Sequence, residues 1–259
     1  MKYEIKALGL GEILDQAIKL IKDKFGLLMG IMALTVIPSQ IAIGYFSQLM
    51  QPQAGQPPQL GSILPLLGGV YFFMLVILPL SNAAVVYATA RTYLGQSVTL
   101  KECFGHGFRR LLPLLWTSIL MGIAIMGGLI LFVIPGLLCI FWFMLAQQVT
   151  VLETMNGFPA LSRSKALMKG NIGTAFVLSL IVGVINIGLS AASNVVPSPF
   201  NIILGAVIAG GVTLVSTCSL VVFYFSCRCK LDNFDLEVLA EEVGSGEVEL
   251  GDDQLSVEG

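Results

Sequence analysis

Charged residues are scarce in this sequence, and three long stretches have none at all. Only 12% of the 259 residues are Asp, Glu, Lys or Arg, against about a quarter in an average soluble protein. Residues 111–134, 136–152 and 172–192 lack all four types and histidine as well. Each has about the 17–25 residues that a helix needs to cross hydrocarbon. This composition excludes an ordinary soluble domain and predicts a polytopic membrane protein.

The groups that usually carry chemistry are also missing. His106 is the only histidine, and no Gly-rich phosphate loop, HExxH or paired-carboxylate motif is present. A carboxylate or base inside a span would indicate ion coupling, but the nearest, Glu153, lies at the end of the fourth apolar run. We therefore predict no catalytic residue, cofactor or metal. Convergence of Glu153, His106 and Arg163 on one pocket would instead favour chemistry.

The five cysteines do not form a disulfide framework. Two lie within apolar runs and three lie on the side that we assign to the cytoplasm, which is a reducing compartment. Cys227 and Cys229 could be half of a metal site or acylated thiols beside a span. Since no second Cys/His cluster accompanies them, we do not assign a metal.

The apolar runs predict an all-α fold, a helical bundle with six transmembrane helices. The expected spans are residues 26–50, 63–90, 111–134, 136–152, 172–192 and 202–227. Pro135-Gly136 makes the turn between the third and fourth spans, and Pro65 and Pro79 predict a tilt or kink in the second. One unit, a surface helix followed by two spans, recurs three times, over residues 8–90, 97–153 and 157–228.

Each unit opens with an amphipathic segment that is expected to lie in the plane of the membrane. Thr99 and Glu102 have the spacing of a capping box at the start of the second segment, 100–110. The three apolar stripes are Leu10, Ile13, Leu14, Ala17 and Ile21; Leu100, Phe104, Phe108 and Leu111; and Ala160, Leu161, Ser164, Leu167 and Met168.

The distribution of basic residues predicts the orientation. In the six-span arrangement all 14 Lys and Arg residues lie before span one, between even and odd spans, or after span six, and none lies in the other three loops. By the positive-inside rule, both termini are then cytoplasmic. The start, residues 1–25, is too long and too acidic for a signal peptide, so the first span is expected to be retained.

Residues 231–259 differ sharply from the rest. They carry 10 of the 16 acidic residues and no Lys or Arg. We expect a mobile, cytoplasmic, acidic tail that contacts a protein partner, with one short helix at its start. Alternatively, it folds back on the basic surface helices. Truncation after Lys230 is then expected to leave insertion and thermal stability nearly unchanged.

Two sets of side chains are candidates for binding. A basic set beside the spans could contact lipid phosphates, or could only set the topology: Arg109, Arg110, Arg163, Lys165 and Lys169. An amide set within the spans could line a polar path, although interhelical hydrogen bonds are the favoured role: Gln147, Gln148 and Asn186.

Three segments together resemble a known family. These are Gly11-Glu-Ile-Leu-Asp-Gln-Ala17, Leu131-Phe-Val-Ile-Pro-Gly-Leu-Leu138, and Glu153 followed by Ala160-Leu-Ser-Arg-Ser-Lys-Ala-Leu-Met-Lys-Gly-Asn171. Over about residues 8–230 the chain resembles the membrane domain of glycerophosphoryl diester phosphodiesterases and related stand-alone bacterial membrane proteins. In fused members a separate soluble domain performs hydrolysis. The 29 residues after Lys230 cannot hold such a domain, so the resemblance implies no phosphodiesterase activity here.

These observations favour a non-enzymatic protein of the cytoplasmic membrane that organises or senses lipid or a protein partner. A transporter or channel for a small solute or lipid is the alternative, based on six spans and the amide set, and a membrane-embedded enzyme comes third. We predict membrane lipid as a partner, and a protein that binds the acidic tail as a possible second one. We predict no nucleic-acid partner, and the sequence leaves the oligomeric state open.

Overall fold

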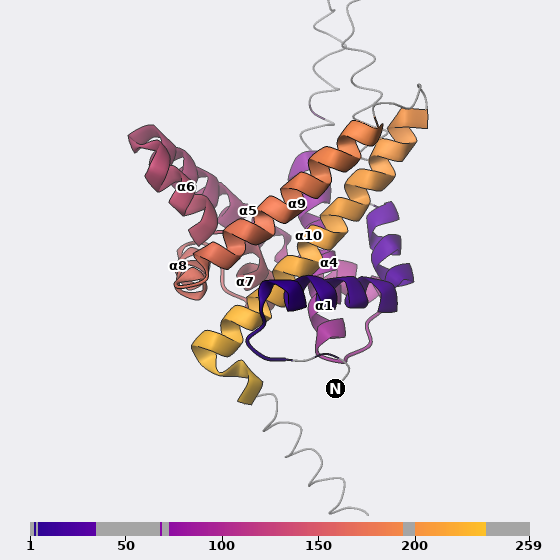
Figure 1. The fold of residues 1–259 in the computed structure, drawn as a ribbon, viewed down its shortest axis with the longest axis horizontal. Coiled ribbons are helices and arrows are strands. Elements are labelled where there is room, and N and C mark those ends of the chain that lie inside the picture. The colour runs from indigo at the N-terminus through magenta and orange to yellow at the C-terminus, as the bar shows by residue number, and fades with distance from the viewer. Residues whose placement is uncertain (1–2, 4, 35–67, 69–72, 194–199, 237–259) are drawn as a thin grey trace, which may run out of the picture.

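The computed structural model describes residues 3, 5–34, 68, 73–193 and 200–236. Within these ranges every regular element is helical, which confirms the predicted all-α class (Figure 1). The elements are α1 (Leu10–Asp23), a short helix Phe25–Leu34, the π-helix η1 (Phe73–Ile77), α4 (Leu78–Tyr93), α5 (Leu100–Leu131), α6 (Val133–Trp142), α7 (Ala146–Leu152), α8 (Phe158–Met168), α9 (Ile172–Ser193) and α10 (Phe200–Asp232).

Five helical segments are long and apolar enough to cross a membrane. They are Leu75–Tyr93, Leu100–Leu131, Val133–Leu152, Ile172–Ala191 and Val207–Asp232. The chain is therefore a membrane protein by length and composition of its helices. The predicted first span, 26–50, lies mostly outside the described residues, as does the first part of the second.

Helices α4 and α10 form the centre of the bundle. About half of the most apolar stretch of each is buried, 50% for the segment with α4 and 56% for α10, against 11% for α5 and for α9. The outer half of α5, α6 and α9 exposes large apolar side chains such as Ile130, Ile134 and Ile187. Exposed apolar surface of this extent is what helices present to lipid. Figure 1 shows α9 beside α10, with the α5–α6 pair extending away from them.

Helix α5 corrects the prediction of a separate surface helix at 100–110. Those residues and the third span form one helix of 32 residues, which begins at the predicted Thr99–Glu102 capping box. The buried face holds Cys103 and Gly107, whereas Phe108, from the predicted stripe, is 70% exposed. A Cβ on Gly107 would lie 3.1 Å from the carbonyl oxygen of Leu80. Close packing of α5 on α4 therefore determines which face is buried.

Helix α5 is also longer than the membrane is thick. At 1.5 Å per residue its length is about 48 Å, against about 30 Å of hydrocarbon. Its first turns carry Lys101, Glu102 and Arg109, so this charged end, with the end of α4 beside it, is the part expected to extend beyond the hydrocarbon. We call the group formed by α1, the end of α4, the start of α5, α8 and the end of α10 the basic layer. Its basic residues include Arg91, Arg110 and Lys230.

The connection between the third and fourth spans differs from the predicted Pro135-Gly136 turn. Helix α5 ends at Leu131, Phe132 is extended (φ −160°, ψ 148°), and α6 already begins at Val133. Pro135 lies in the first turn of α6, where its missing N–H costs no hydrogen bond. Gly136 lies against α5: a Cβ there would lie 2.5 Å from the side chain of Leu129.

The candidate span Val133–Leu152, which contains the predicted fourth span, is interrupted, and the sequence did not predict this. It consists of α6 and α7, separated by a turn at residues 143–145. Ser164 of α8 donates its hydroxyl to the carbonyl oxygen of Trp142 over 2.8 Å. The carbonyl group freed by the interruption is thus satisfied by a side chain, as a buried polar backbone group requires.

The third predicted stripe is buried as a whole. Helix α8 buries all five of its members, while Lys165 and Lys169 on the opposite face are exposed. Helix α1 buries Ile13 and Ala17 of its stripe and packs against α10 (Figure 1). Just before α1, the backbone N–H of Leu8 donates to Ser226 Oγ at 2.9 Å.

The last helix corrects the boundary that we predicted after Lys230. Helix α10 continues to Asp232, and Phe234 stacks on Phe225 with ring centroids 5.7 Å apart. These residues belong to the bundle and not to a separate tail. The remaining acidic residues of the tail, from Glu237 on, lie outside the described residues.

Candidate functional site

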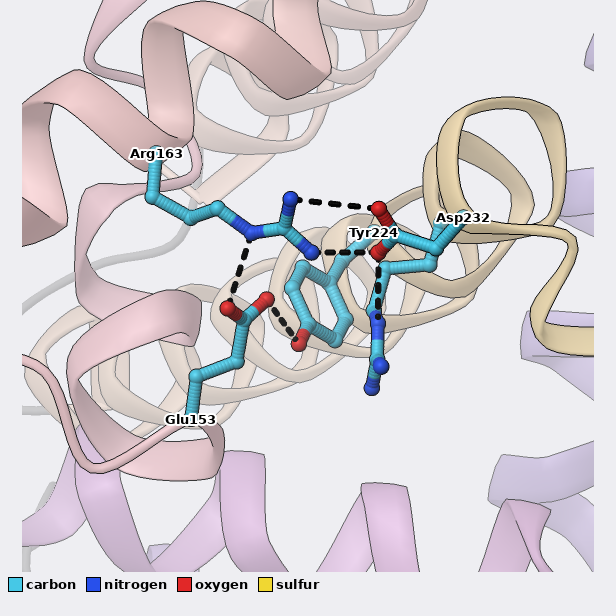
Figure 2. Close-up of polar contacts among 5 residues, drawn as sticks. Glu153, Arg163, Tyr224 and Asp232 are labelled. Atoms are coloured by element: carbon cyan, nitrogen blue, oxygen red, sulfur yellow. Dashed lines mark hydrogen bonds and ion pairs between the residues drawn. The ribbon is translucent and has the colours of Figure 1, made fainter. Parts of the chain in front are cut away.

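One arginine connects three segments at the edge of the basic layer. Arg163 of α8 donates from Nε to Glu153 Oε2 over 2.8 Å and from Nη1 to Asp232 Oδ1 over 3.2 Å. Its Nη2 also binds Asp232 Oδ2. Figure 2 shows the guanidinium group between the two carboxylates, one from the end of α7 and one from the end of α10. We call these three residues the Arg163 clamp.

Two neighbours complete the clamp. Tyr224 donates its hydroxyl to Glu153 Oε1 at 2.7 Å (Figure 2), and Arg228 Nε donates to Asp232 Oδ2 at 3.3 Å. Both oxygens of Glu153 are therefore engaged. Hydrogen bonds to Asp232, and then to Glu153, raise the pKa of Arg163 above its usual value. Arg163 thus stays charged and is used to join helices.

The other four members of the basic set are placed differently. Arg109, Lys165 and Lys169 are exposed and Arg110 is half-buried. Lys165 Nζ lies 4.3 Å from the centroid of the Trp142 ring, a cation–π distance. These side chains do not form one cluster with Arg163, but their charges remain available at the surface.

The three amides of the predicted polar path are not brought together. Gln147 accepts a hydrogen bond from Asn82 of α4, which is an interhelical contact. Gln148 is 3% exposed and its Oε1 has no hydrogen-bond partner among the described residues. Asn186 lies on the exposed side of α9 and accepts from Ser190 at 3.2 Å. The described residues show an interhelical role for Gln147 only.

A cavity of about 280 Å³ lies where the ends of α4, α7 and α10 meet the start of α5. Its wall includes Arg91, His106, Thr154, Tyr224 and Arg228. We call it the four-helix cavity. Glu153 and Arg163 are not among its lining residues, so Glu153, His106 and Arg163 do not converge on one pocket. Tyr224 connects the two features, since it lines the cavity and binds Glu153.

His106 is held in a defined orientation at the cavity wall. Its ring stacks on Tyr87 with centroids 4.1 Å apart, and its Nε2 lies 3.1 Å from the carbonyl oxygen of Val151. A carbonyl oxygen can only accept, so Nε2 carries the hydrogen and Nδ1 is the acceptor in the neutral ring. We find no group of three His, Cys, Asp or Glu residues able to hold a metal in the described part of the chain.

Sequence analysis missed most of these residues. Arg91 and Arg228 were used only for topology, Tyr224 was read as part of a span, and Asp232 was assigned to the tail. The one feature of the sequence that could have pointed to the cavity was that Arg91 and Arg228 each directly follow a long apolar run. Their convergence depends on how the helices pack, which no local pattern in the sequence shows.

Comparison with known proteins gives a family but no function. No curated protein and no solved structure matches the chain. A family model described as "Domain of unknown function (DUF8558)" matches residues 108–250, which is 143 of the 259 residues and more than half of the chain. The matched region begins within α5 and includes the Arg163 clamp. The protein thus belongs to the family of domain of unknown function DUF8558.

Proposed function

We propose that this protein is a non-enzymatic, six-span protein of the cytoplasmic membrane, with both termini in the cytoplasm, which organises or senses anionic lipid. Within the basic layer, the exposed face of α8 lies along the inner leaflet and makes the main lipid contacts. The resemblance to the membrane domain of glycerophosphoryl diester phosphodiesterases supports a stand-alone membrane module. Engagement of both Glu153 oxygens in the clamp supports a structural role for that carboxylate rather than a catalytic one.

The observation that carries this proposal is the pairing of exposed cations with exposed apolar side chains. On α8, Phe158 is 71% exposed beside the exposed Lys165 and Lys169, while the opposite face is buried in the bundle. On α5, Phe108 is 70% exposed next to exposed Arg109. Apolar side chains enter the acyl boundary while Lys and Arg attract lipid phosphates, at about 1 kcal/mol per charge.

The test compares two double variants of equal charge. Lys165→Gln/Lys169→Gln removes the cations of α8, and Lys22→Gln/Lys101→Gln removes two exposed cations from α1 and the start of α5. The Tm is measured in nonionic detergent while phosphatidylglycerol or phosphatidylcholine is added. Ligand that binds the folded state raises the Tm. We expect phosphatidylglycerol to raise the Tm of the parent and of the control pair, and to raise it much less in the α8 pair.

Two results would contradict the proposal. One is an equal effect of both lipids on the parent protein, which would show no preference for anionic headgroups. The other is full retention of the phosphatidylglycerol effect in the α8 pair.

A transport function is the second candidate, and the interruption between α6 and α7 favours it. Transporters build their substrate sites at interrupted helices, where irregular backbone lines a cavity. Here the hydroxyl of Ser164 already donates a hydrogen bond to the carbonyl oxygen of Trp142. This contact fits a structural role for the interruption rather than a substrate site. Substrate-dependent flux in liposomes that contain the purified protein would favour transport over lipid organisation.

A further inference from the structure

The four-helix cavity combines positive charge with aromatic walls, and the proposed lipid contacts of α8 do not involve it. Arg91 and Arg228 approach it from α4 and α10, and no carboxylate is among its lining residues. Arg91 donates to the neutral amide of Gln96, and no described carboxylate forms an ion pair with it. Arg228 binds Asp232 through Nε at 3.3 Å. The cavity therefore has an excess of positive charge.

Both guanidinium groups are oriented by aromatic rings. Arg91 Cζ lies 5.2 Å from the centroid of Tyr87, and Arg228 Cζ lies 4.1 Å from that of Phe234. Stacking on a ring restricts a guanidinium group while it leaves in-plane N–H donors free for an anion. The same rings give the cavity apolar surface that water does not solvate well.

The backbone of the wall is also unusual. Thr154 has φ of 62°, in the left-handed region that a β-branched residue rarely adopts. This conformation follows the end of α7, where Glu153 binds Arg163 while Thr154 lines the cavity. Nearby, Nδ1 of His106 is left as an acceptor. Two guanidinium groups, a hydroxyl and a ring nitrogen therefore accompany the apolar wall.

We propose that the four-helix cavity binds a phosphate monoester that carries an apolar group. Two guanidinium groups match a doubly charged phosphate, since each presents paired N–H donors to anionic oxygens. A volume of about 280 Å³ accommodates such a group together with a small apolar substituent, near the lower end of the range for ligand pockets. The phosphate can belong to a soluble metabolite or to a lipid headgroup, because the cavity lies in the basic layer.

The experiment measures binding to the purified full chain in nonionic detergent by isothermal titration calorimetry. The probes are inorganic phosphate, phenyl phosphate, dioctanoyl phosphatidic acid and, as the lipid without phosphate, dioctanoylglycerol. We expect saturable one-to-one binding of phenyl phosphate or of phosphatidic acid, tighter than that of inorganic phosphate. Binding of phenyl phosphate indicates a soluble ligand, and binding of phosphatidic acid alone indicates a lipid.

The variants separate this cavity from general attraction to a positive surface. Arg91→Gln and Arg228→Gln are each expected to weaken binding about tenfold or more, the usual cost of a lost charged hydrogen bond. Lys101→Gln, exposed and outside the cavity, is expected to leave the affinity unchanged. The Tm of each variant without ligand serves as the folding control, and Arg91→Lys provides a second variant that keeps the charge but loses the paired donors.

Three outcomes would overturn the proposal: no saturable binding of any phosphate probe, equally tight binding of dioctanoylglycerol, or an equal loss of affinity in Lys101→Gln. Failure of the α8 lipid test leaves these measurements interpretable, because Lys165 and Lys169 do not line the cavity.

Discussion

At the scale of single residues, charge pairing decides what each polar group does. Arg163 has a side chain 22% exposed, Glu153 12% and Asp232 25%, so the clamp is partly shielded from water. Partial burial strengthens each ion pair, but it also makes an unpaired partner costly. Residues that the sequence presents only as surface charges therefore become connections between helices.

Arg163→Gln is expected to lower the free energy of unfolding by about 1–3 kcal/mol, because it leaves Glu153 partly buried without its cation. The same change at exposed Lys22 is the control and is expected to have little effect. Thermal unfolding in detergent measures both. A double-mutant cycle with Asp232→Asn isolates the pair energy, and a coupling energy near zero would show that the Arg163–Asp232 pair does not contribute.

Tyr3 provides a pH-dependent contact. Its hydroxyl donates to Asp23 Oδ2 at 2.7 Å, and burial, followed by the bond to Asp23, raises the pKa of Tyr3 above its usual value. The folded state then holds the proton more tightly than the unfolded state. The stabilisation of the folded state by this hydrogen bond is fully present below about pH 10, the ordinary tyrosine pKa. It is lost as the pH rises above that value.

We therefore expect the Tm difference between the parent and Tyr3→Phe to be constant from pH 7 to 9 and to shrink above about pH 10. The comparison cancels the titration of lysines, which both proteins share. A difference that stays constant to pH 11 would contradict the assigned role of the hydroxyl.

At the scale of elements, close backbone approach holds α5 and α6 together. A Cβ on Gly128 would lie 3.0 Å from the Cα of Gly136, and one on Gly136 would lie 2.8 Å from the backbone nitrogen of Leu129. Contacts under 3 Å with backbone cannot be relieved by a side-chain rotation. The geometry of this hairpin thus depends on glycine, even though both positions lie in helices.

Gly136→Ala is expected to destabilise the protein by about 1–3 kcal/mol through overpacking. Gly127→Ala is a matched control in the same hairpin, because nothing lies within 4 Å of its added Cβ. Alanine favours a helix over glycine by about 1 kcal/mol, so this control is expected to be neutral or stabilising. Equal melting temperatures for the two variants would show that α5 and α6 can separate enough to accommodate the added methyl group.

At the scale of the whole molecule, the basic layer joins distant parts of the chain. Ser226 of α10 binds Leu8, Lys230 Nζ donates to Asn171 Oδ1 at 3.0 Å, and Asp232 binds Arg163. The end of α10 thus contacts the segment before α1, α8 and the start of α9. We expect stability to be sensitive to where the chain is shortened.

Truncation after Lys230 is now expected to lower the Tm, in contrast to the near-neutral effect that the sequence suggested, because it deletes Asp232 and Phe234. Truncation after Leu236 keeps both residues and serves as the matched control. Thermal unfolding of the two shortened proteins in detergent is the measurement. If the two shortened proteins have the same Tm, residues 231–236 do not stabilise the bundle and belong to the tail.

The proposed orientation predicts the accessibility of introduced cysteines. In intact cells, a membrane-impermeant maleimide is expected to label Gln56→Cys, and to label Ser162→Cys on the exposed face of α8 only after permeabilisation. The unmodified protein controls for its native thiols, of which Cys103, Cys218, Cys227 and Cys229 are buried. The opposite pattern of labelling would reverse the orientation.

Composition and periodicity alone determined the membrane class, the all-helical fold, the bounds of α9 and the buried face of α8. These properties depend on local physics: bilayer thickness sets the length of a span, and helical periodicity sets which residues share a face. The capping box at Thr99 and Glu102 was predictable for the same reason. It involves atoms only three residues apart.

Only the tertiary structure decided the continuity of α5, the interruption of the fourth span, the Arg163 clamp and the four-helix cavity. Each depends on groups far apart in sequence: Leu80 against Gly107, Ser164 on Trp142, and Asp232 on Arg163. A residue pattern specifies the face of a helix but not its partner. The partner is selected by packing distance and by the cost of leaving a buried polar group unpaired.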